Sequence, residues 1–230
     1  YIMSRVEVDD RVREIMTIAN KRNIPMLEIP RSELDRLTDG SVHQGVAMQI
    51  PPYKYPDATD LVLDTMERWH SGKLSTPPLF VALDGITDPR NLGAIIRSVS
   101  AFSGDGVIIP ERRSAAVTAG AWKTSAGAAA RIPVAMATNL TRVIQQAKEQ
   151  GIFVIGLDGG GDIELPALEL ANEPLCVVVG SEGKGLSRLV TENCDQIVSI
   201  PLDSAMESLN AAMAVGITLY DVSRRRASAN

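Results

Sequence analysis

The sequence is poor in cysteine, histidine and aromatic residues, and each scarcity excludes a class of protein. Its 230 residues include 2 Cys and 2 His, which is too few for a disulfide framework or a histidine-based zinc site. We therefore expect a cytoplasmic protein without a metal, since a reducing compartment is the default for such a chain. An aromatic content of 4% argues against a stacking platform for single-stranded nucleic acid.

Long hydrophobic runs and excess positive charge are also absent. No apolar run approaches the ~20 residues of a transmembrane helix, and Tyr1–Asp10 mixes acidic and basic residues, unlike a signal peptide. We therefore expect no membrane association. A formal net charge of -5 argues against binding nucleic acid through bulk charge, although it allows a local basic patch.

The first fifty residues resemble a small α/β unit. Helices are expected at Asp9–Asn20 and Arg31–Leu37, the second with Ser32 as its N-cap, and strands at Ile24–Ile29 and Val46–Ile50. Two short helices and two short strands can bury too little apolar surface to form an independent core. We interpret residues 1–52 as part of a domain whose opening strand and helix are missing.

A proline-rich segment and a larger domain follow. Residues 53–77 have prolines near both ends and a short helix pattern at Leu61–Trp69, so we expect a linker. Residues 78–230 alternate continuous apolar runs with helical patterns, which predicts an open, mostly parallel α/β sheet with helices on both faces. The expected strands are Leu79–Leu83, Val107–Ile109, Ile132–Ala135, Ile152–Leu157, Leu175–Val179 and Ile197–Ile200, and the expected helices are Asn91–Phe102, Asn139–Glu149, Leu186–Asn193 and Ser208–Arg226.

The first segment of chemical interest follows the strand at Leu79–Leu83. In open α/β sheets, ligands collect beyond the carboxyl ends of the strands. The helix from Asn91 has an apolar stripe toward the sheet, which places Arg90 and Arg97 together on the opposite face. Asn91 could hold a loop or cap the helix. The alternative is two solvated arginines on an amphipathic helix.

Three further segments follow later strands. Gly180–Gly185 has three glycines in six residues, so its backbone can approach a ligand closely, or it forms a plain strand-to-helix turn. Ile200–Asn210 leads into a long helix with small residues, for which Ser204 or Ser208 could serve only as an N-cap. Asp158–Gly161 is a loop at the ligand end of the sheet and not a phosphate cradle, because Asp162 and Glu164 would repel a pyrophosphate.

Taken together and in this order, three of these segments resemble the motifs of the SpoU (TrmH-type) family of RNA ribose 2'-O-methyltransferases in the SPOUT superfamily. The motifs are Asn91-x-Gly93 with Arg97, then Gly180-x-Glu182-Gly183-x-Gly185, then Ile200-Pro201 with Ser208-Leu209-Asn210. His43-Gln44-Gly45-Val46 before a strand also resembles the small ribosomal-protein-like RNA-binding domain of the 23S rRNA branch. Ser103-Gly104 and Ala211-Ala212-Met213 depart from the family's usual pattern, and neither departure removes one of the motif residues named above.

The resemblance implies a deep C-terminal trefoil knot, a homodimer and S-adenosylmethionine bound by the knot loops. By position, the family's cofactor contacts fall on Gly180, Ile200 and Leu209, with Leu157 and Gly185 as neighbours. Its catalytic arginine falls on Arg97, with Asn91, Glu182 and Asn210 organising the site and Ser208 touching the target nucleotide. Arg97 cannot readily act as a base, because the pKa of arginine exceeds ~12, so we assign it to the target phosphate and the developing alkoxide.

RNA is the expected partner, with a local basic surface making the phosphate contacts. The candidates are Arg90, Arg112, Arg113 and Lys123, with Arg131 and a basic tail at Arg224–Arg226. The leading hypothesis is methylation of 23S rRNA. Methylation of tRNA, protection against a ribosome-targeting antibiotic, a non-catalytic RNA-binding module and a nucleotide-binding oxidoreductase are the alternatives.

Overall fold

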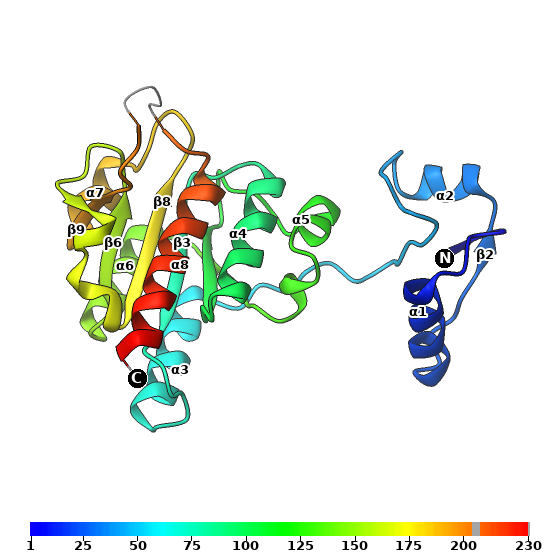
Figure 1. Ribbon diagram of the computed structural model, residues 1–230, viewed down its shortest axis with the longest axis horizontal. Helices are drawn as coiled ribbons and strands as arrows, with labels where there is room; N and C mark the ends of the chain where they lie inside the picture. The colour runs from blue at the N-terminus through cyan, green and yellow to red at the C-terminus, as the bar shows by residue number, and fades with distance from the viewer. Residues whose placement is uncertain (204–207, 230) are drawn as a thin grey trace. The chain divides into compact units, whose positions relative to one another are not determined.

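The computed structural model describes residues 1–203 and 208–229, and it divides the chain into two compact units, Tyr1–Pro52 and Tyr53–Asn230 (Figure 1). The segment that we expected to be a linker, residues 53–77, is packed into the second unit. The hydroxyls of Tyr53 and Tyr55 accept hydrogen bonds from the backbone N–H groups of Val134 and Val117, at 2.9 and 2.8 Å. Buried apolar side chains of the following helix complete the packing.

The first unit contains two helices and a very small parallel sheet. Strands β1 (Ile2–Met3) and β2 (Glu28–Ile29) pair side by side, and helices α1 (Asp10–Lys21) and α2 (Arg31–Leu37) follow them in turn. The Asp9 carboxylate caps α1 by accepting from the N–H of Val12. Few side chains are buried, chiefly Val12, Ala19 and Leu34.

Several predictions for this unit were wrong in detail. The sequence pattern also did not predict strand β1, which pairs in parallel with β2. The strand predicted at Ile24–Ile29 is formed only at its end, and Val46 makes an isolated bridge to Ile2 in place of a strand. The N-cap of α2 is Pro30, with no side-chain cap hydrogen bond, and not Ser32.

The second unit is built on a parallel sheet of seven strands, in the order β5-β4-β3-β8-β6-β9-β7. Every pairing among these strands is parallel. The parallel sheet confirms the predicted α/β class. The prediction was possible because strands that are buried on both faces have continuous apolar sequences. The strands are β3 (Leu79–Asp84), β4 (Gly106–Pro110), β5 (Val134–Ala137), β6 (Phe153–Leu157), β7 (Ile163–Glu164), β8 (Leu175–Gly180) and β9 (Gln196–Ser199).

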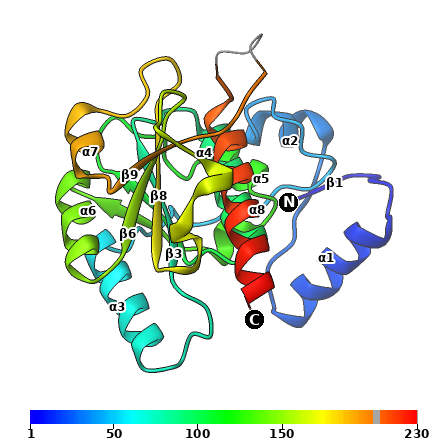
Figure 2. The same cartoon turned by 60° about the vertical axis from the view of Figure 1, so that its left-hand side comes forward.

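Helices cover both faces of the sheet (Figure 2). One face carries α4 (Pro89–Ala101), α5 (Ala119–Thr124) and α8 (Ala211–Ala229), with short 3-10 turns between strands. The other carries α3 (Ala58–His70), α6 (Leu140–Glu149) and α7 (Arg188–Asn193). As expected, the apolar stripe of α4, which includes Leu92, Ile95, Ile96 and Val99, is buried.

The trefoil knot stays a prediction, since the segment that enters α8 includes residues 204–207, which lie outside the described residues. Of the helices in the described ranges, none is long and apolar enough to cross a membrane.

Candidate functional site

A pocket of about 720 Å³ opens at the carboxyl ends of β6, β8 and β9. Because these strands are parallel neighbours, the loops that follow them meet at one edge of the sheet. The pocket is lined by residues of those three loops and of the start of α8: Leu157, Asp158, Gly159, Gly160, Val179, Gly180, Ser181, Glu182, Gly183, Gly185, Ile200, Leu202, Ser208, Leu209, Asn210, Ala211 and Ala214.

The loop after β8 folds back onto its own strand. Ser181 and Gly185 exchange two backbone hydrogen bonds, at 3.1 and 2.9 Å. A Cβ added at Gly180 would overlap the backbone of Gly185, whose own φ of +64° favours glycine. The glycines therefore shape a tight backbone wall for the pocket.

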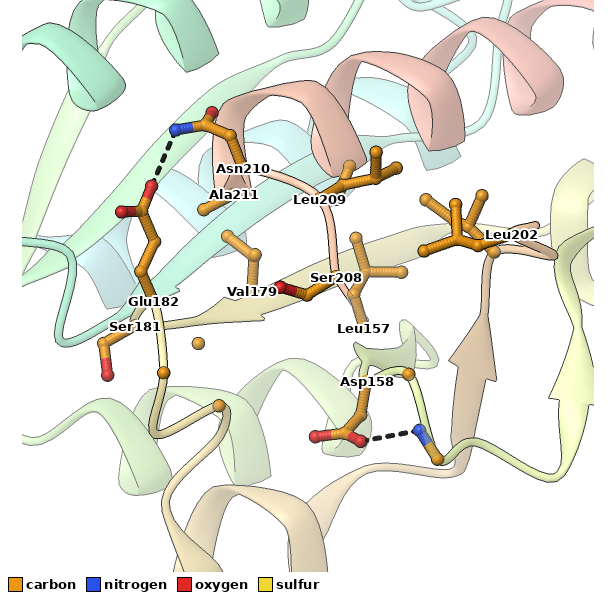
Figure 3. Close-up of a pocket in the computed structure, with 17 residues that line it drawn as sticks. Leu157, Asp158, Val179, Ser181, Glu182, Leu202, Ser208, Leu209, Asn210 and Ala211 are labelled. Carbon is orange, nitrogen blue, oxygen red and sulfur yellow. Dashed lines mark hydrogen bonds between the residues drawn. The ribbon is translucent and has the colours of Figure 1, made fainter. Parts of the chain in front are cut away.

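Three polar side chains from distant parts of the chain form a closed hydrogen-bonded triangle beside this wall. The Nδ2 group of Asn91 donates to Oε1 of Glu182 at 3.0 Å. The Nδ2 group of Asn210 donates to the same oxygen at 2.6 Å and to Oδ1 of Asn91 at 3.0 Å. Figure 3 shows the Asn210–Glu182 side of the triangle. The triangle joins α4, the loop after β8 and the start of α8.

Asn210 has a second role, as the cap of α8. Its Oδ1 accepts from the backbone N–H groups of Ala212 and Met213, at 2.9 and 3.4 Å. Ser208, which was one predicted cap, accepts no such hydrogen bond from the described residues. Ser204, which was the other, lies outside the described residues. The helix that carries Asn91 is capped by Asp88, so Asn91 is left to hold the loop.

Most of the site residues predicted from the sequence meet at this pocket. Gly180, Ile200, Leu209, Leu157 and Gly185, which the family resemblance assigns to the cofactor, all line it. Glu182, Ser208 and Asn210 line it too, and Asn91 reaches it through the triangle. No observation tests the role of any of them, so these roles stay predictions.

The predicted basic residues do not line the pocket. Arg97 lies on the exposed side of α4 and forms no hydrogen bond or ion pair with the described residues. Arg90, Arg112, Arg113 and Lys123 are exposed as well. Their positions leave them accessible to a large polyanion approaching the surface.

The basic tail expected at Arg224–Arg226 is used inside the fold. Arg224 and Arg225 bind Asp221 at 2.8 and 2.7 Å. Arg226 donates to the carbonyls of Pro77, Ala171 and Glu173, and burial lowers its pKa to about 10. Arg225 also donates to the carbonyls of Leu165, Pro166 and Leu168. The prediction that this run forms a phosphate-binding tail was therefore wrong for Arg225 and Arg226, whose guanidinium groups bind backbone carbonyls.

Sequence reasoning missed Asp158 and Asp84 as parts of the site. The Asp-Gly-Gly-Gly pattern predicted a loop at the ligand end of the sheet, where Asp158 does line the pocket, but it gave the aspartate itself no role. Oδ2 of Asp84, at the end of β3, accepts from the N–H of Ser187 at 2.6 Å and so fixes the chain after the glycine-rich loop. In both cases the sequence showed an aspartate at the carboxyl end of a predicted strand, which could have identified the residue as part of the site. Within residues 1–203 and 208–229, no group of three or more His, Cys, Asp and Glu residues could hold a metal ion.

Two family models match the chain and together cover both units. The model described as the SpoU rRNA Methylase family matches residues 78–220, more than half of the chain. The chain belongs to the SpoU methylase family. A second model, described as RNA 2'-O ribose methyltransferase substrate binding, matches residues 2–56. The SpoU family assignment inferred from the three motifs is thereby confirmed.

Relatives and solved structures agree with this assignment. A Mycobacterium avium protein called a tRNA/rRNA methyltransferase is 55% identical over 98% of this chain and 71% of its own length. A Mycobacterium leprae protein with a similar description is 54% identical over 98% of this chain and 71% of its own. The SpoU methylase described here is thus similar to RNA methyltransferases along nearly its whole length.

The fold is shared with solved SpoU methyltransferases. AviRb from Streptomyces viridochromogenes, solved in complex with the cofactor AdoMet, has a TM-score of 0.71 and 24% identity, covering 99% of this chain and 82% of its own. An AdoMet-bound rRNA methyltransferase from Sinorhizobium meliloti has a TM-score of 0.71 and 22% identity, covering 94% of this chain and 77% of its own.

Proposed function

We propose that this SpoU methylase transfers a methyl group from S-adenosylmethionine to a ribose 2'-hydroxyl of 23S rRNA. The observation that carries the proposal is the Asn91–Glu182–Asn210 triangle, because it brings one residue from each of the three motif segments to a single pocket. The name of the model matched by residues 2–56 supports the ribose 2'-oxygen as the acceptor.

The pocket fits S-adenosylmethionine in size and character. A volume of about 720 Å³ lies within the ~300–1,000 Å³ of small-molecule sites. Leu157, Val179 and Leu209 supply apolar surface for an adenine ring, and the glycine wall leaves backbone N–H and C=O groups within reach of it. S-adenosylmethionine supplies an electrophilic methyl group on a positively charged sulfur.

The protein's own contribution is to position the acceptor and to stabilise charge. We assign Arg97 to the target phosphate and to the 2'-oxygen, where its guanidinium stabilises the negative charge that develops as the hydroxyl loses its proton. Glu182 is held between two asparagine amides and so keeps the loop after β8 against α4 and α8. Ser208, at the pocket wall, is assigned to the target nucleotide.

We further propose that the functional unit is a homodimer packed through α8. Three exposed apolar side chains follow one another at helical spacing on this helix: Met213, Ile217 and Tyr220, which are 60%, 37% and 56% exposed. The same helix packs against α4, where a Cβ on Gly216 would lie 3.4 Å from Oγ of Ser98, the neighbour of Arg97. The proposed interface therefore involves the helix that packs directly against α4, which carries Arg97.

Methylation of tRNA is the second candidate. The relatives are named as tRNA/rRNA methyltransferases without a choice between the two. A solved structure that concerns the 2-OH methylation of C/U34 on tRNA shares the fold over 67% of this chain, with a TM-score of 0.59. The N-terminal unit favours rRNA, because the alignment with that tRNA-modifying structure covers 99% of its own chain and only 67% of this one.

The test is to incubate the protein with S-adenosylmethionine carrying a labelled methyl group and with rRNA or tRNA from cells lacking the gene. We expect label in 23S rRNA at one nucleotide, whose 3' phosphodiester becomes resistant to alkali because the 2'-oxygen is blocked. Label in tRNA alone would favour the second candidate. Label on a base would refute the ribose assignment, and no label in either RNA would favour a non-catalytic RNA-binding module.

A further inference from the structure

Among the described residues, the lining of the pocket carries a negative formal charge. Its lining contains two carboxylates, Asp158 and Glu182, and no Lys, Arg or His from the described chain. Neither carboxylate forms an ion pair within residues 1–203 and 208–229. Figure 3 shows both side chains, which come from the loops after β6 and β8.

The two carboxylates differ in how they are used. Glu182 accepts two amide hydrogen bonds in the triangle, which occupy Oε1 and fix its direction. Asp158 accepts one bond at Oδ1, from the N–H of Gly160 at 2.9 Å. Its Oδ2 accepts none from the described residues and lies 3.0 Å from the position that a Cβ on Gly185 would occupy. This oxygen therefore faces the glycine wall of the pocket.

Asp158 is held firmly enough for its charge to act at a fixed place. Its N–H donates to the carbonyl of Val198 at 3.1 Å, and its own carbonyl accepts from the N–H of Gly161 at 3.1 Å. Together with the Gly160 bond, these contacts fix the backbone N–H, the backbone carbonyl and one carboxylate oxygen of Asp158. A fixed charge needs no reorganisation when a ligand arrives.

We propose that Asp158 is a charge-selecting residue, which makes the pocket bind the cationic cofactor S-adenosylmethionine more tightly than its neutral product S-adenosylhomocysteine. The proposal rests on the proposed function. During transfer a C–O bond forms to the acceptor oxygen and the C–S bond breaks. The C–S electron pair stays on sulfur and cancels its charge, and the acceptor's proton leaves to solvent. In this proposal the Asp158 carboxylate attracts a cation before transfer and no longer attracts the neutral thioether after it, so the reaction itself weakens binding and favours product release.

Asp158 is exposed, so its interaction with a charged ligand is screened by water, and this sets the expected difference in affinity between the two ligands. The two ligands share their adenosine, amino and carboxylate groups and differ by the methyl group and one positive charge. A charge pair about 4–5 Å apart in a water-like dielectric corresponds to about a 4- to 6-fold change in affinity. Salt screens the interaction, because the Debye length is about 8 Å at physiological ionic strength.

The experiment measures the dissociation constants of both ligands by calorimetry for the wild-type protein, Asp158→Asn and Asp162→Asn. Asparagine keeps the Oδ1 acceptor for the Gly160 N–H, so the loop should stay folded, and an unchanged melting temperature without ligand checks this. Asp162→Asn is the matched control, since it removes the same charge from the same loop at an exposed position outside the pocket lining.

We expect Asp158→Asn to weaken S-adenosylmethionine binding by about 4- to 6-fold and to leave S-adenosylhomocysteine within twofold. Raising salt should reduce this preference in the wild-type protein and not in the variant. Equal losses for the two ligands would overturn the proposal, because Asp158 would then hold a group that they share. No change for either ligand, or the same preference loss in Asp162→Asn, would overturn it too. If the wild-type protein bound neither ligand, the proposed function itself would fail.

Discussion

Arg97 is the residue on which the proposed chemistry most depends. It is exposed on α4 and lies away from the buried stripe of that helix, so the core should tolerate its loss. We expect Arg97→Ala to change the free energy of unfolding by about 0.5 kcal/mol or less and to reduce methyl transfer by about a hundredfold or more. Arg97→Lys should fail as well, since an ammonium group lacks the planar fork of a guanidinium. Single-turnover kinetics and thermal unfolding measure the two effects.

Arg90 provides the matched control for Arg97. Both arginines are exposed on the same helix, yet we assign only general phosphate binding to Arg90. Arg90→Ala should weaken RNA affinity and lower its salt dependence without a loss of single-turnover rate. An Arg97→Ala protein that methylated RNA at the wild-type rate would show that Arg97 is simply a solvated helix residue.

Among the elements, α8 is fixed at both ends by side-chain to backbone contacts. Asn210 caps its start, and near its end Arg226 donates to carbonyls of Pro77, Ala171 and Glu173. We expect Arg226→Ala to destabilise the protein by about 1–3 kcal/mol, since it leaves partly buried carbonyls without a donor. For a chain of this size, that corresponds to a fall in melting temperature of about 2–4 °C per kcal/mol.

Arg224→Ala is the control for this prediction. Arg224 is exposed, and its side chain pairs with Asp221 on its own helix and with no other residue in the part of the chain that the structure describes. Such a surface pair contributes little to stability. A similar fall in melting temperature for both variants would mean that α8 loses helix stability in general, and not the carbonyl contacts of Arg226.

At the same scale, the sequence predicted long buried elements well and short ones poorly. The strand β8 was clear because its residues are buried on both faces and all apolar. Helix α5, Ala-Gly-Ala-Trp-Lys-Thr, has no apolar periodicity, and β7 has two residues, so neither left a pattern. The triangle could not be derived from spacing, because Asn91 and Asn210 are 119 residues apart and meet only through the sheet topology. Only the family resemblance pointed to those residues together.

At the scale of the whole molecule, ligand binding should stabilise the native state. The pocket exists only where the loops after β6, β8 and β9 meet, so an unfolded chain cannot bind S-adenosylmethionine in the same way. A hundredfold excess over the dissociation constant should add about 2.7 kcal/mol to the free energy of unfolding. Differential scanning fluorimetry measures the shift, with ATP as a control adenine ligand. An absence of both a shift and calorimetric heat at millimolar ligand would contradict the cofactor assignment.

The proposed dimer makes a second prediction at this scale. A stable interface buries roughly 1,200–2,000 Å², and the exposed Met213, Ile217 and Tyr220 would lie inside it. We expect light scattering to give twice the 24.7 kDa of one chain, and Ile217→Glu to give a folded monomer. Exposed Leu63 on α3 provides the control, since Leu63→Glu should leave the dimer intact. A wild-type protein that is monomeric at micromolar concentration would refute the dimer.

The contacts of residues 53–57 protect one edge of the sheet in the second unit. Strand β5 lies at the end of the sheet order, and the N–H of Met136 donates to the carbonyl of Pro56, while Asp57 bridges to Met136. With the Tyr53 hydroxyl on the Val134 N–H, this stretch covers an edge strand whose free N–H groups would otherwise template aggregation. A shortened protein that began at residue 78, where the family match begins, would leave the edge of β5 exposed. A fragment meant to fold as the second unit should therefore begin no later than Tyr53.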